Sequence, residues 1–205
     1  MQNIRVWGDV STLSSDDSAT ALHEAWAEVN LINNLSVKLG RQEIVYDDHR
    51  IFGSVGWAQQ ARSHDAFIFK YTPNKNNRID VGFALNSDSQ SGTDVLYSNV
   101  AGYKTFQYAW YHGKFSDIGL SFLALNTGIE YEDTSLNQQI AYRQTVGPRV
   151  TYKKDKLDAN AAVYLQMGEV GEVKVKALYY AVNLGYKINK NFKVAVGYEF
   201  LSGKD

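Results

Sequence analysis

The densest group of side chains that could pair ions, bind a metal or move protons lies between Gly40 and Asp65. Its cations are Arg41, Arg50 and Arg62, its carboxylates are Glu43, Asp47, Asp48 and Asp65, and its imidazoles are His49 and His64. A guanidinium and a carboxylate can form two parallel hydrogen bonds, which fix geometry as well as charge. We therefore expect the carboxylates to pin a folded loop, and the arginines to be placed where they also contact an anionic solute.

Two other kinds of chemistry were considered for this stretch. Carboxylates suit Ca²⁺ and imidazoles suit transition metals, but these acids and histidines lack the regular spacing of a metal-binding loop. Ser63, His64 and Asp65 supply the residue types of a hydrolytic triad, yet neighbours on a strand point to opposite faces and cannot converge. No Gly-x-Ser-x-Gly, His-Glu-x-x-His or glycine-rich phosphate loop occurs. We therefore predict no metal site, no cofactor and no enzymatic activity.

Segments with the two-residue alternation of β-strands surround this stretch. Residues 22–31 and 35–43 lead into it, and residues 65–71 lead out of it. The same alternation begins at residues 3–10 and continues to residues 192–200, which gives about eleven strands. The sequence therefore predicts an all-β, antiparallel chain that runs up and down without helices.

The alternation also predicts which side chains share a face. Apolar rows are expected to face lipid and the other rows to face an aqueous interior, as on residues 78–86, where Ile79 and Val81 alternate with Arg78 and Asp80. By the same rule, the row formed by Phe106, Tyr108 and Trp110 is expected to face lipid. Pro148 falls inside a strand, which predicts an edge, a bulge or a missing ladder bond.

The connections between the strands alternate in length. Long polar connections are expected at residues 11–20, 47–65, 87–100, 128–141 and 168–172, and short turns at residues 32–34, 74–77, 113–117, 153–156 and 189–191. Outer-membrane barrels have this pattern, with short periplasmic turns and long extracellular loops. Strands of about ten residues are long enough to cross a bilayer when tilted. The pattern therefore favours an up-and-down transmembrane β-barrel over a soluble sandwich.

Three motifs of the charged stretch carry a resemblance to a known family. Residues 40–43 read Gly-Arg-Gln-Glu, residues 46–50 read Tyr-Asp-Asp-His-Arg, and residues 62–65 read Arg-Ser-His-Asp. This sequence resembles the signature of the alginate-export family of outer-membrane β-barrels. The resemblance implies location in the outer membrane of a Gram-negative bacterium and a parent barrel of about eighteen strands. Residues 1–205 are then expected to be a single barrel segment, without the parent's first and last strands.

Composition excludes several other classes of protein. The chain has 205 residues, 44% of them hydrophobic, 14 tyrosines, no cysteine and a formal net charge of −1. This composition removes disulfides and cysteine metal sites and gives no basic surface for nucleic acid. The chain contains no run of 18 apolar residues, so no transmembrane helix is predicted. A soluble antiparallel sheet, with a carbohydrate-binding or structural role, remains the alternative, and a requirement for detergent separates it from a barrel.

The interior rows predict what a barrel of this kind would pass. They carry both signs of charge, and one strand carries a basic row of Arg143, Arg149 and Lys153. Charged rings along a pore set its ion selectivity. We predict a channel for polar or anionic solutes, with a polysaccharide such as alginate as the candidate that the resemblance implies. The expected partners are the lipid bilayer and the solute, and the expected solute contacts are Arg41, Arg50, Arg62, Arg78, Arg143, Arg149 and Lys153.

Overall fold

The computed structural model describes residues 2–3, 20–53, 62–86 and 102–202, and it contains one large antiparallel sheet. Two residue pairs form a small separate sheet, β1 (Gln2–Asn3) and β2 (Thr20–Ala21). The strands of the large sheet are β3 (Ala25–Ile32), β4 (Leu35–Gln42), β5 (His64–Asn74), β6 (Asn77–Leu85), β7 (Thr105–Phe115), β8 (Ile118–Glu132), β9 (Gln138–Lys154), β10 (Leu157–Val170), β11 (Val173–Lys187) and β12 (Lys193–Leu201). The described part of the chain holds no helix long and apolar enough to span a membrane.

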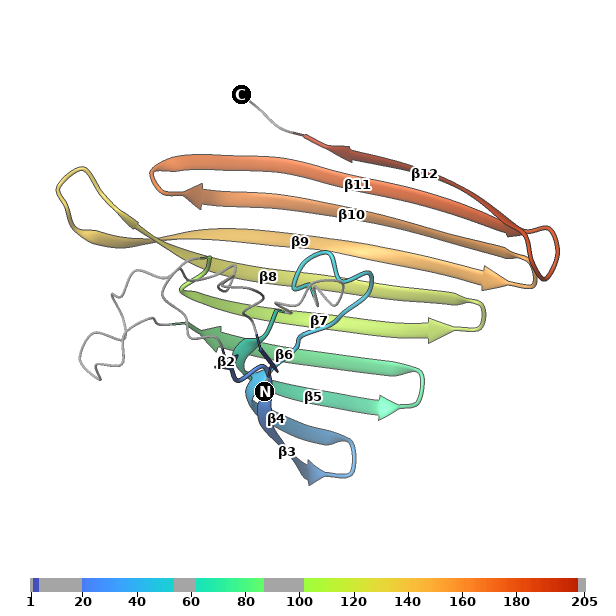
Figure 1. Cartoon of the computed structure of the whole chain (residues 1–205), viewed down its shortest axis with the longest axis horizontal. Coiled ribbons are helices and arrows are strands. Elements are labelled where there is room, and N and C mark those ends of the chain that lie inside the picture. Colours follow the sequence, from blue (N-terminus) through green and yellow to red (C-terminus); the bar gives the residue numbers. More distant parts are fainter. Residues whose placement is uncertain (1, 4–19, 54–61, 87–101, 203–205) are drawn as a thin grey trace.

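Each strand of the large sheet pairs with its neighbours in the sequence, so the order from edge to edge is simply β3 to β12. Figure 1 shows the turns β3–β4, β5–β6, β7–β8, β9–β10 and β11–β12 gathered at one end of the sheet, and the connections β4–β5, β6–β7, β8–β9 and β10–β11 at the other. The predicted all-β, antiparallel, up-and-down fold is confirmed, with ten strands in an open sheet. The additional strand expected at residues 3–10 lies almost entirely outside the described residues.

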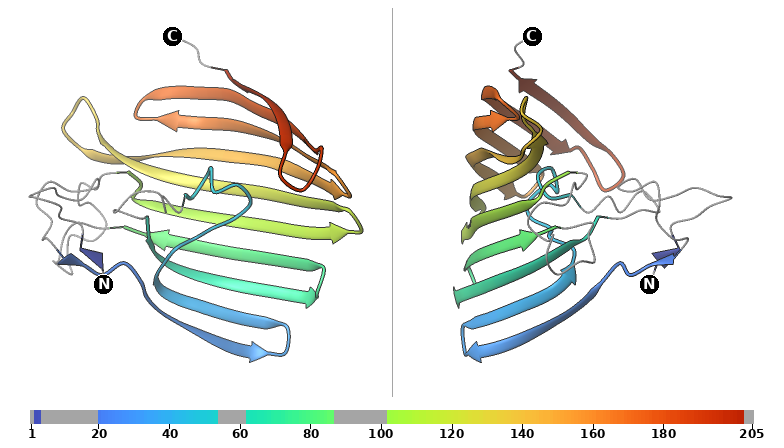
Figure 2. Two further views of the ribbon diagram at one scale, coloured as in Figure 1. Left: turned by 45° about the vertical axis from the view of Figure 1, so that its right-hand side comes forward. Right: turned by 90° about the vertical axis from the view of Figure 1, so that its left-hand side faces the viewer.

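The sheet is curved, and its two faces differ in chemistry. Residues 43–53, which we call the inner segment, lie against the concave face (Figure 2). The convex face is largely apolar and open, and side chains such as Phe83, Val182 and Val196 are 48%, 51% and 67% exposed. Because water would be a poor solvent for such a surface, the division suits a wall with lipid on its convex side.

The strands in the second half of the sheet are longer than the sequence pattern predicted. A loop at residues 128–141 was expected, but β8 continues to Glu132 and β9 starts at Gln138, so only residues 133–137 form the turn. There the Asp133 carboxylate accepts the backbone N–H groups of Ser135 and Asn137, which lowers its pKa. The prediction was wrong because polar residues in paired strands were interpreted as a loop. The loop expected at residues 168–172 is likewise reduced to two residues between β10 and β11.

Pro148 interrupts the ladder between β9 and β10, as predicted. Pairing runs from Leu157 opposite Lys154 to Ala162 opposite Arg149, and it resumes in the same register at Leu165 opposite Val146. On the other side, Pro148 still lies opposite Phe122 of β8. The missing N–H therefore costs a ladder contact on one side only and does not shift the register.

Four tyrosines lie in the outward rows near the short turns. Tyr71 and Tyr111 both lie opposite Ile79, Tyr152 lies opposite Ile118, and Tyr186 lies opposite Leu157. Amphipathic rings at this depth are typical of the interfacial girdle of a membrane barrel.

Candidate functional site

The aromatic row of β7 faces the concave side, contrary to the sequence prediction. Phe106, Tyr108 and Trp110 are 3%, 3% and 7% exposed, whereas apolar side chains in convex rows are mostly about half exposed. The row lies beneath the inner segment, which covers the apolar rings and removes them from solvent. Strand periodicity alone predicted lipid contact because it cannot distinguish a row covered by lipid from one covered by the chain itself.

Two buried apolar side chains anchor the ends of the inner segment. Ile44 is 2% exposed and Phe52 is 5% exposed, and both belong to the core cluster of the sheet. The Phe52 ring centroid lies 4.9 Å from that of Tyr108 and 5.5 Å from that of Phe106. Burial of two such side chains stabilises the segment by roughly 3–6 kcal/mol before the entropy of ordering it is counted.

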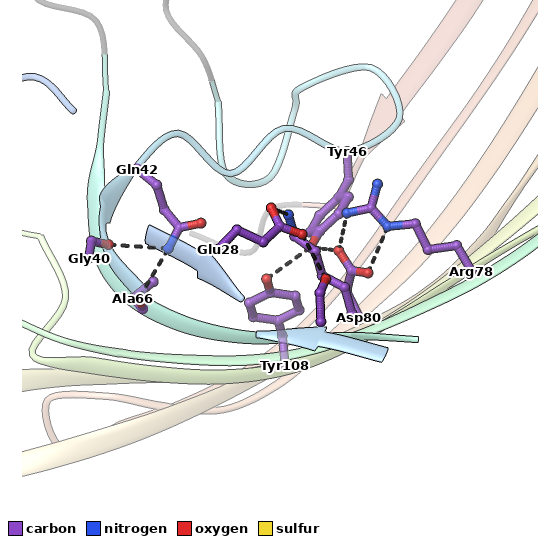
Figure 3. Close-up of polar contacts among 10 residues, drawn as sticks. Glu28, Gly40, Gln42, Tyr46, Ala66, Arg78, Asp80 and Tyr108 are labelled. Atoms are coloured by element: carbon purple, nitrogen blue, oxygen red, sulfur yellow. Dashed lines mark hydrogen bonds and ion pairs between the residues drawn. The ribbon is translucent and has the colours of Figure 1, made fainter. Parts of the chain in front are cut away.

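Tyr46 makes the central contact between the inner segment and the sheet (Figure 3). Its ring stacks on Trp110 with centroids 4.2 Å apart. Its hydroxyl donates to Asp80 Oδ2 at 2.5 Å and lies 2.9 Å from the Tyr108 hydroxyl. Arg78 donates from Nε and a terminal nitrogen to both oxygens of Asp80, at 2.7 and 2.5 Å. Asp80 is fully buried, so these partners are what make its charge tolerable there.

The burial of Tyr46 also affects its ionisation. Desolvation, together with the neighbouring Tyr108 and Asp80, raises the pKa of Tyr46 well above its usual value. The phenol therefore stays protonated and can donate to Asp80 over the whole physiological pH range.

Asp47 holds the next position of the inner segment. Its Oδ2 accepts the indole N–H of Trp110 at 3.0 Å, and its Oδ1 accepts the Ser121 hydroxyl at 2.5 Å. Ser121 Oγ lies in turn 3.0 Å from His112 Nδ1. The backbone turns sharply here: Asp47 and His49 have φ of 52° and 64°, and the His49 N–H donates to the Tyr46 carbonyl. Asp and His adopt this left-handed conformation more readily than most residues.

The remaining charged side chains of the inner segment reach the later strands. Asp48 forms an ion pair with Arg149 of β9, with 2.5 Å between the oxygen and the nitrogen. Arg50 forms one with Glu199 of β12 at 2.6 Å, and its guanidinium lies 4.5 Å from the Tyr179 ring centroid. Segments that are 101 and 149 residues apart in the sequence are joined by these two pairs.

The other predicted pinning residues lie elsewhere. Arg41 and Asp65 form a bidentate pair, at 2.9 and 2.7 Å, but their alternation with Gln42 and His64 places them on the convex face. Glu43 lies 2.8 Å from His23. Arg62 donates to the carbonyl of Phe52 at 3.5 Å. Within the charged stretch, Arg41 and Asp65 thus pair with each other, whereas Asp47, Asp48 and Arg50 bond to later strands of the sheet.

Most other charges of the concave face are paired as well. Lys70 lies 2.7 Å from Glu28, and Lys193 lies 2.7 Å from Asp158. Within the described residues, Arg143 and Lys153 of β9 have no ion-pair partner. Lys38 lies over the Trp26 ring, 3.8 Å from its centroid. In the described part of the chain, β9 therefore presents two cations without an ion-pair partner on the concave face.

The side chains considered for metal binding and catalysis do not converge. Asp47, Asp48, His64 and Asp65 each have a different partner, Trp110 with Ser121, Arg149, Tyr103 and Arg41 respectively. Across residues 20–53, 62–86 and 102–202, no group of three His, Cys, Asp or Glu side chains could hold a metal ion. His64 and Asp65 lie on opposite faces of β5, which keeps the triad residue types apart.

Several residues of this site were not predicted to be site residues. They are Tyr46 of the inner segment, and Tyr108, Trp110, Ser121 and Tyr179, which contact the segment through rings and hydroxyls. One signal was available: Asp80 is a carboxylate in the middle of an apolar strand, and such a group requires a partner. Alternation places Arg78 on the same face two residues away, so this partner could be found from spacing. Tyr46 could not, because it lies 34 residues away in a loop.

A family model described as alginate export matches residues 2–205 of the chain. The match covers every strand of the large sheet and the whole inner segment. A comparison with curated proteins finds no match.

Proposed function

Because the chain belongs to the alginate export family, a transport family of the Gram-negative outer membrane, we propose that it forms part of the wall of an outer-membrane channel for polar or anionic solutes. A polysaccharide such as alginate is the solute class that the family implies. In this proposal lipid contacts the convex face, and the solute passes along the concave face beside the inner segment.

The observation that carries the proposal is the division of chemistry between the two faces. The convex rows are apolar and exposed, while the concave face holds the ion pairs Arg78–Asp80, Arg149–Asp48 and Arg50–Glu199. A soluble carbohydrate-binding sheet would leave the convex surface in water. A requirement for detergent by the purified full-length protein separates these two functions.

The charge on the concave face supports an anionic solute. Arg143, Arg149 and Lys153 follow one another along the inward row of β9, and only Arg149 has a carboxylate partner within the described chain. A carboxylate on a passing solute could pair with Arg143 and Lys153, and could exchange with Asp48 at Arg149. Arg50 offers a similar exchange with Glu199, because both side chains are partly exposed. Arg41, on the convex face, is not part of this proposal.

The test is ion selectivity of the full-length protein in a planar bilayer under a salt gradient. Replacing Arg143, Arg149 and Lys153 with glutamine is expected to shift the reversal potential toward that of a cation-preferring pore. The control replaces Lys154 and Lys156 with glutamine, at the short-turn end of the same hairpin, and should leave the reversal potential unchanged. An unchanged reversal potential in the triple variant would show that β9 does not line the pore.

A further inference from the structure

A groove of about 690 Å³ lies on the convex face of β9–β11. It is at the end of the sheet where the long connections 43–63 and 86–104 join β4 to β5 and β6 to β7. Its outward side chains come from three strands: Ile140 and Tyr142 of β9, Leu165, Met167 and Glu169 of β10, and Lys174 and Lys176 of β11. Figure 1 shows this end of the β10–β11 hairpin on the left, opposite the tight turns. The groove is therefore separate from the concave site and from the inner segment.

A polar row marks the place where the apolar convex surface ends. Gln107, Asn126 and Gln144 lie opposite one another on β7, β8 and β9. Their amides form a chain: Asn126 donates to Gln107 at 2.8 Å, and Gln144 donates to Asn126 at 2.7 Å. In the same register Gln144 lies opposite Met167, and Met167 lies opposite Lys176. Polar groups on a lipid-facing surface are expected at the headgroup level, where water can reach them.

The outward row of β11 changes character at this level. From Leu178 to Tyr186 it is apolar, and the two positions before Leu178 in the same row are Lys176 and Lys174. Glu169 lies opposite Lys174, whereas Lys176 lies opposite Met167. Neither lysine has an ion-pair partner among the described residues, and both are exposed. The groove thus joins an apolar wall to two ammonium groups, and the one carboxylate in its lining, Glu169, lies opposite Lys174 and away from Lys176.

We propose that this groove binds a phosphorylated lipid of the outer leaflet, of the lipid A type. The lipid phosphate would pair with Lys176 and Lys174, and an acyl chain would lie against Met167 and Leu165. Long connections of outer-membrane barrels face the cell exterior, which puts the groove in that leaflet. This inference rests on the outer-membrane location within the proposed function, but not on the solute or on the inner segment.

The arrangement favours a lipid over free phosphate. A free anion would gain little from Leu165, Met167 and Tyr142, because these side chains offer apolar area and no positive charge. An acyl chain beside a headgroup phosphate uses both parts of the groove. Each lysine near an anionic lipid surface is expected to change binding by about fivefold.

The experiment is native mass spectrometry of the full-length protein, released from detergent in the presence of bisphosphorylated lipid A or of lipid A without its phosphates. The wild type is expected to retain the phosphorylated lipid preferentially. The variant with Lys174→Gln and Lys176→Gln should retain at least about fivefold less. The matched control carries Lys154→Gln and Lys156→Gln, at the short-turn end, and should retain as much as the wild type.

Two results overturn the inference: equal retention by the test and control variants, and equal retention of the two lipids by the wild type. Conductance measured on the same preparations separates this inference from the proposed function. A conducting protein without lipid selectivity contradicts the lipid site alone. A non-conducting protein that retains lipid A through the two lysines contradicts the channel alone.

Discussion

The inner segment contacts two regions of the concave face in different ways. Over β5–β8 it is held by Phe52, Tyr46 and Asp47, through stacked rings and hydrogen bonds to groups that are almost fully buried. Over β9–β12 it is held by two ion pairs, whose side chains are 37% and 43% exposed in Arg50–Glu199 and 11% and 35% exposed in Arg149–Asp48. One region is therefore dry and the other is open to solvent.

The difference indicates which contacts a solute could replace. Breaking a buried pair leaves an uncompensated charge such as that of Asp80, which is strongly unfavourable. Exposed ion pairs contribute only about 0–1 kcal/mol, because water and salt compete with them. The region over β5–β8 thus positions the inner segment. The region over β9–β12 presents Arg50 with an exposed carboxylate partner that can be exchanged, and Arg149 with a partner that is exposed on its Asp48 side.

The largest expected effect comes from removing the Tyr46 side chain. Tyr46→Ala deletes the stack on Trp110 and the hydroxyl bound to Asp80, and it should weaken docking of the inner segment by about 3–5 kcal/mol. The measurement uses the cysteine-free background. A cysteine at position 84, where Ala84 is 3% exposed on the concave face, should react slowly with a water-soluble thiol reagent and much faster after Tyr46→Ala.

Two further single cysteines control that experiment. A cysteine in place of Thr151, in the exposed inward row of β9, should be labelled equally with and without Tyr46→Ala. A cysteine in place of Val163, in the convex row of β10, should stay protected by lipid in both. Protection at position 84 that survives Tyr46→Ala would mean that the dry contacts do not hold the segment.

A smaller effect is expected from pH, through the raised pKa of Tyr46. Docking requires the protonated phenol, whereas the phenol of a released segment has its usual pKa near 10. The stability of docking is therefore fully present below about pH 10 and falls as pH rises above it, by up to about 1.4 kcal/mol per pH unit. Labelling of a cysteine at position 84 should accelerate between pH 10 and 11.5.

The Tyr46→Phe variant is the control for the pH experiment. It keeps the stack on Trp110 but has no phenol to ionise, so its labelling should be faster than wild type at pH 9 and flat above pH 10. The cysteine thiol is already ionised across this range and adds no slope of its own. A wild type as flat as Tyr46→Phe would show that ionisation of this phenol does not control docking.

The smallest effect is expected from the exposed pairs. Arg50→Gln, Glu199→Gln and the double variant form a cycle whose coupling should be about 0.2–1 kcal/mol, read from the same labelling rates. Added salt should reduce it further, because exposed pairs are screened. A coupling of several kcal/mol would show that Arg50 holds the inner segment in place as the buried contacts over β5–β8 do.

The architecture could be predicted because strand physics is local. Alternation along residues such as those of β6 predicts a strand and its two faces, and turns such as Asn189–Asn191 end strands through local side-chain hydrogen bonds. Pro148 could be interpreted in the same way, since the missing N–H is a property of the residue itself. The full length of β8 and β9 could not be predicted from the sequence, because polar residues form strands when a neighbouring strand pairs with them.

The sequence by itself determined the antiparallel strands, their connectivity, the apolar convex rows and the family signature. Only the tertiary structure decided that the row of Phe106, Tyr108 and Trp110 is covered by the chain's own segment. It also decided that Asp48 and Arg50 pair with Arg149 and Glu199. The physical reason is that alternation specifies which residues share a face. What covers that face depends on contacts between residues that are distant in the chain.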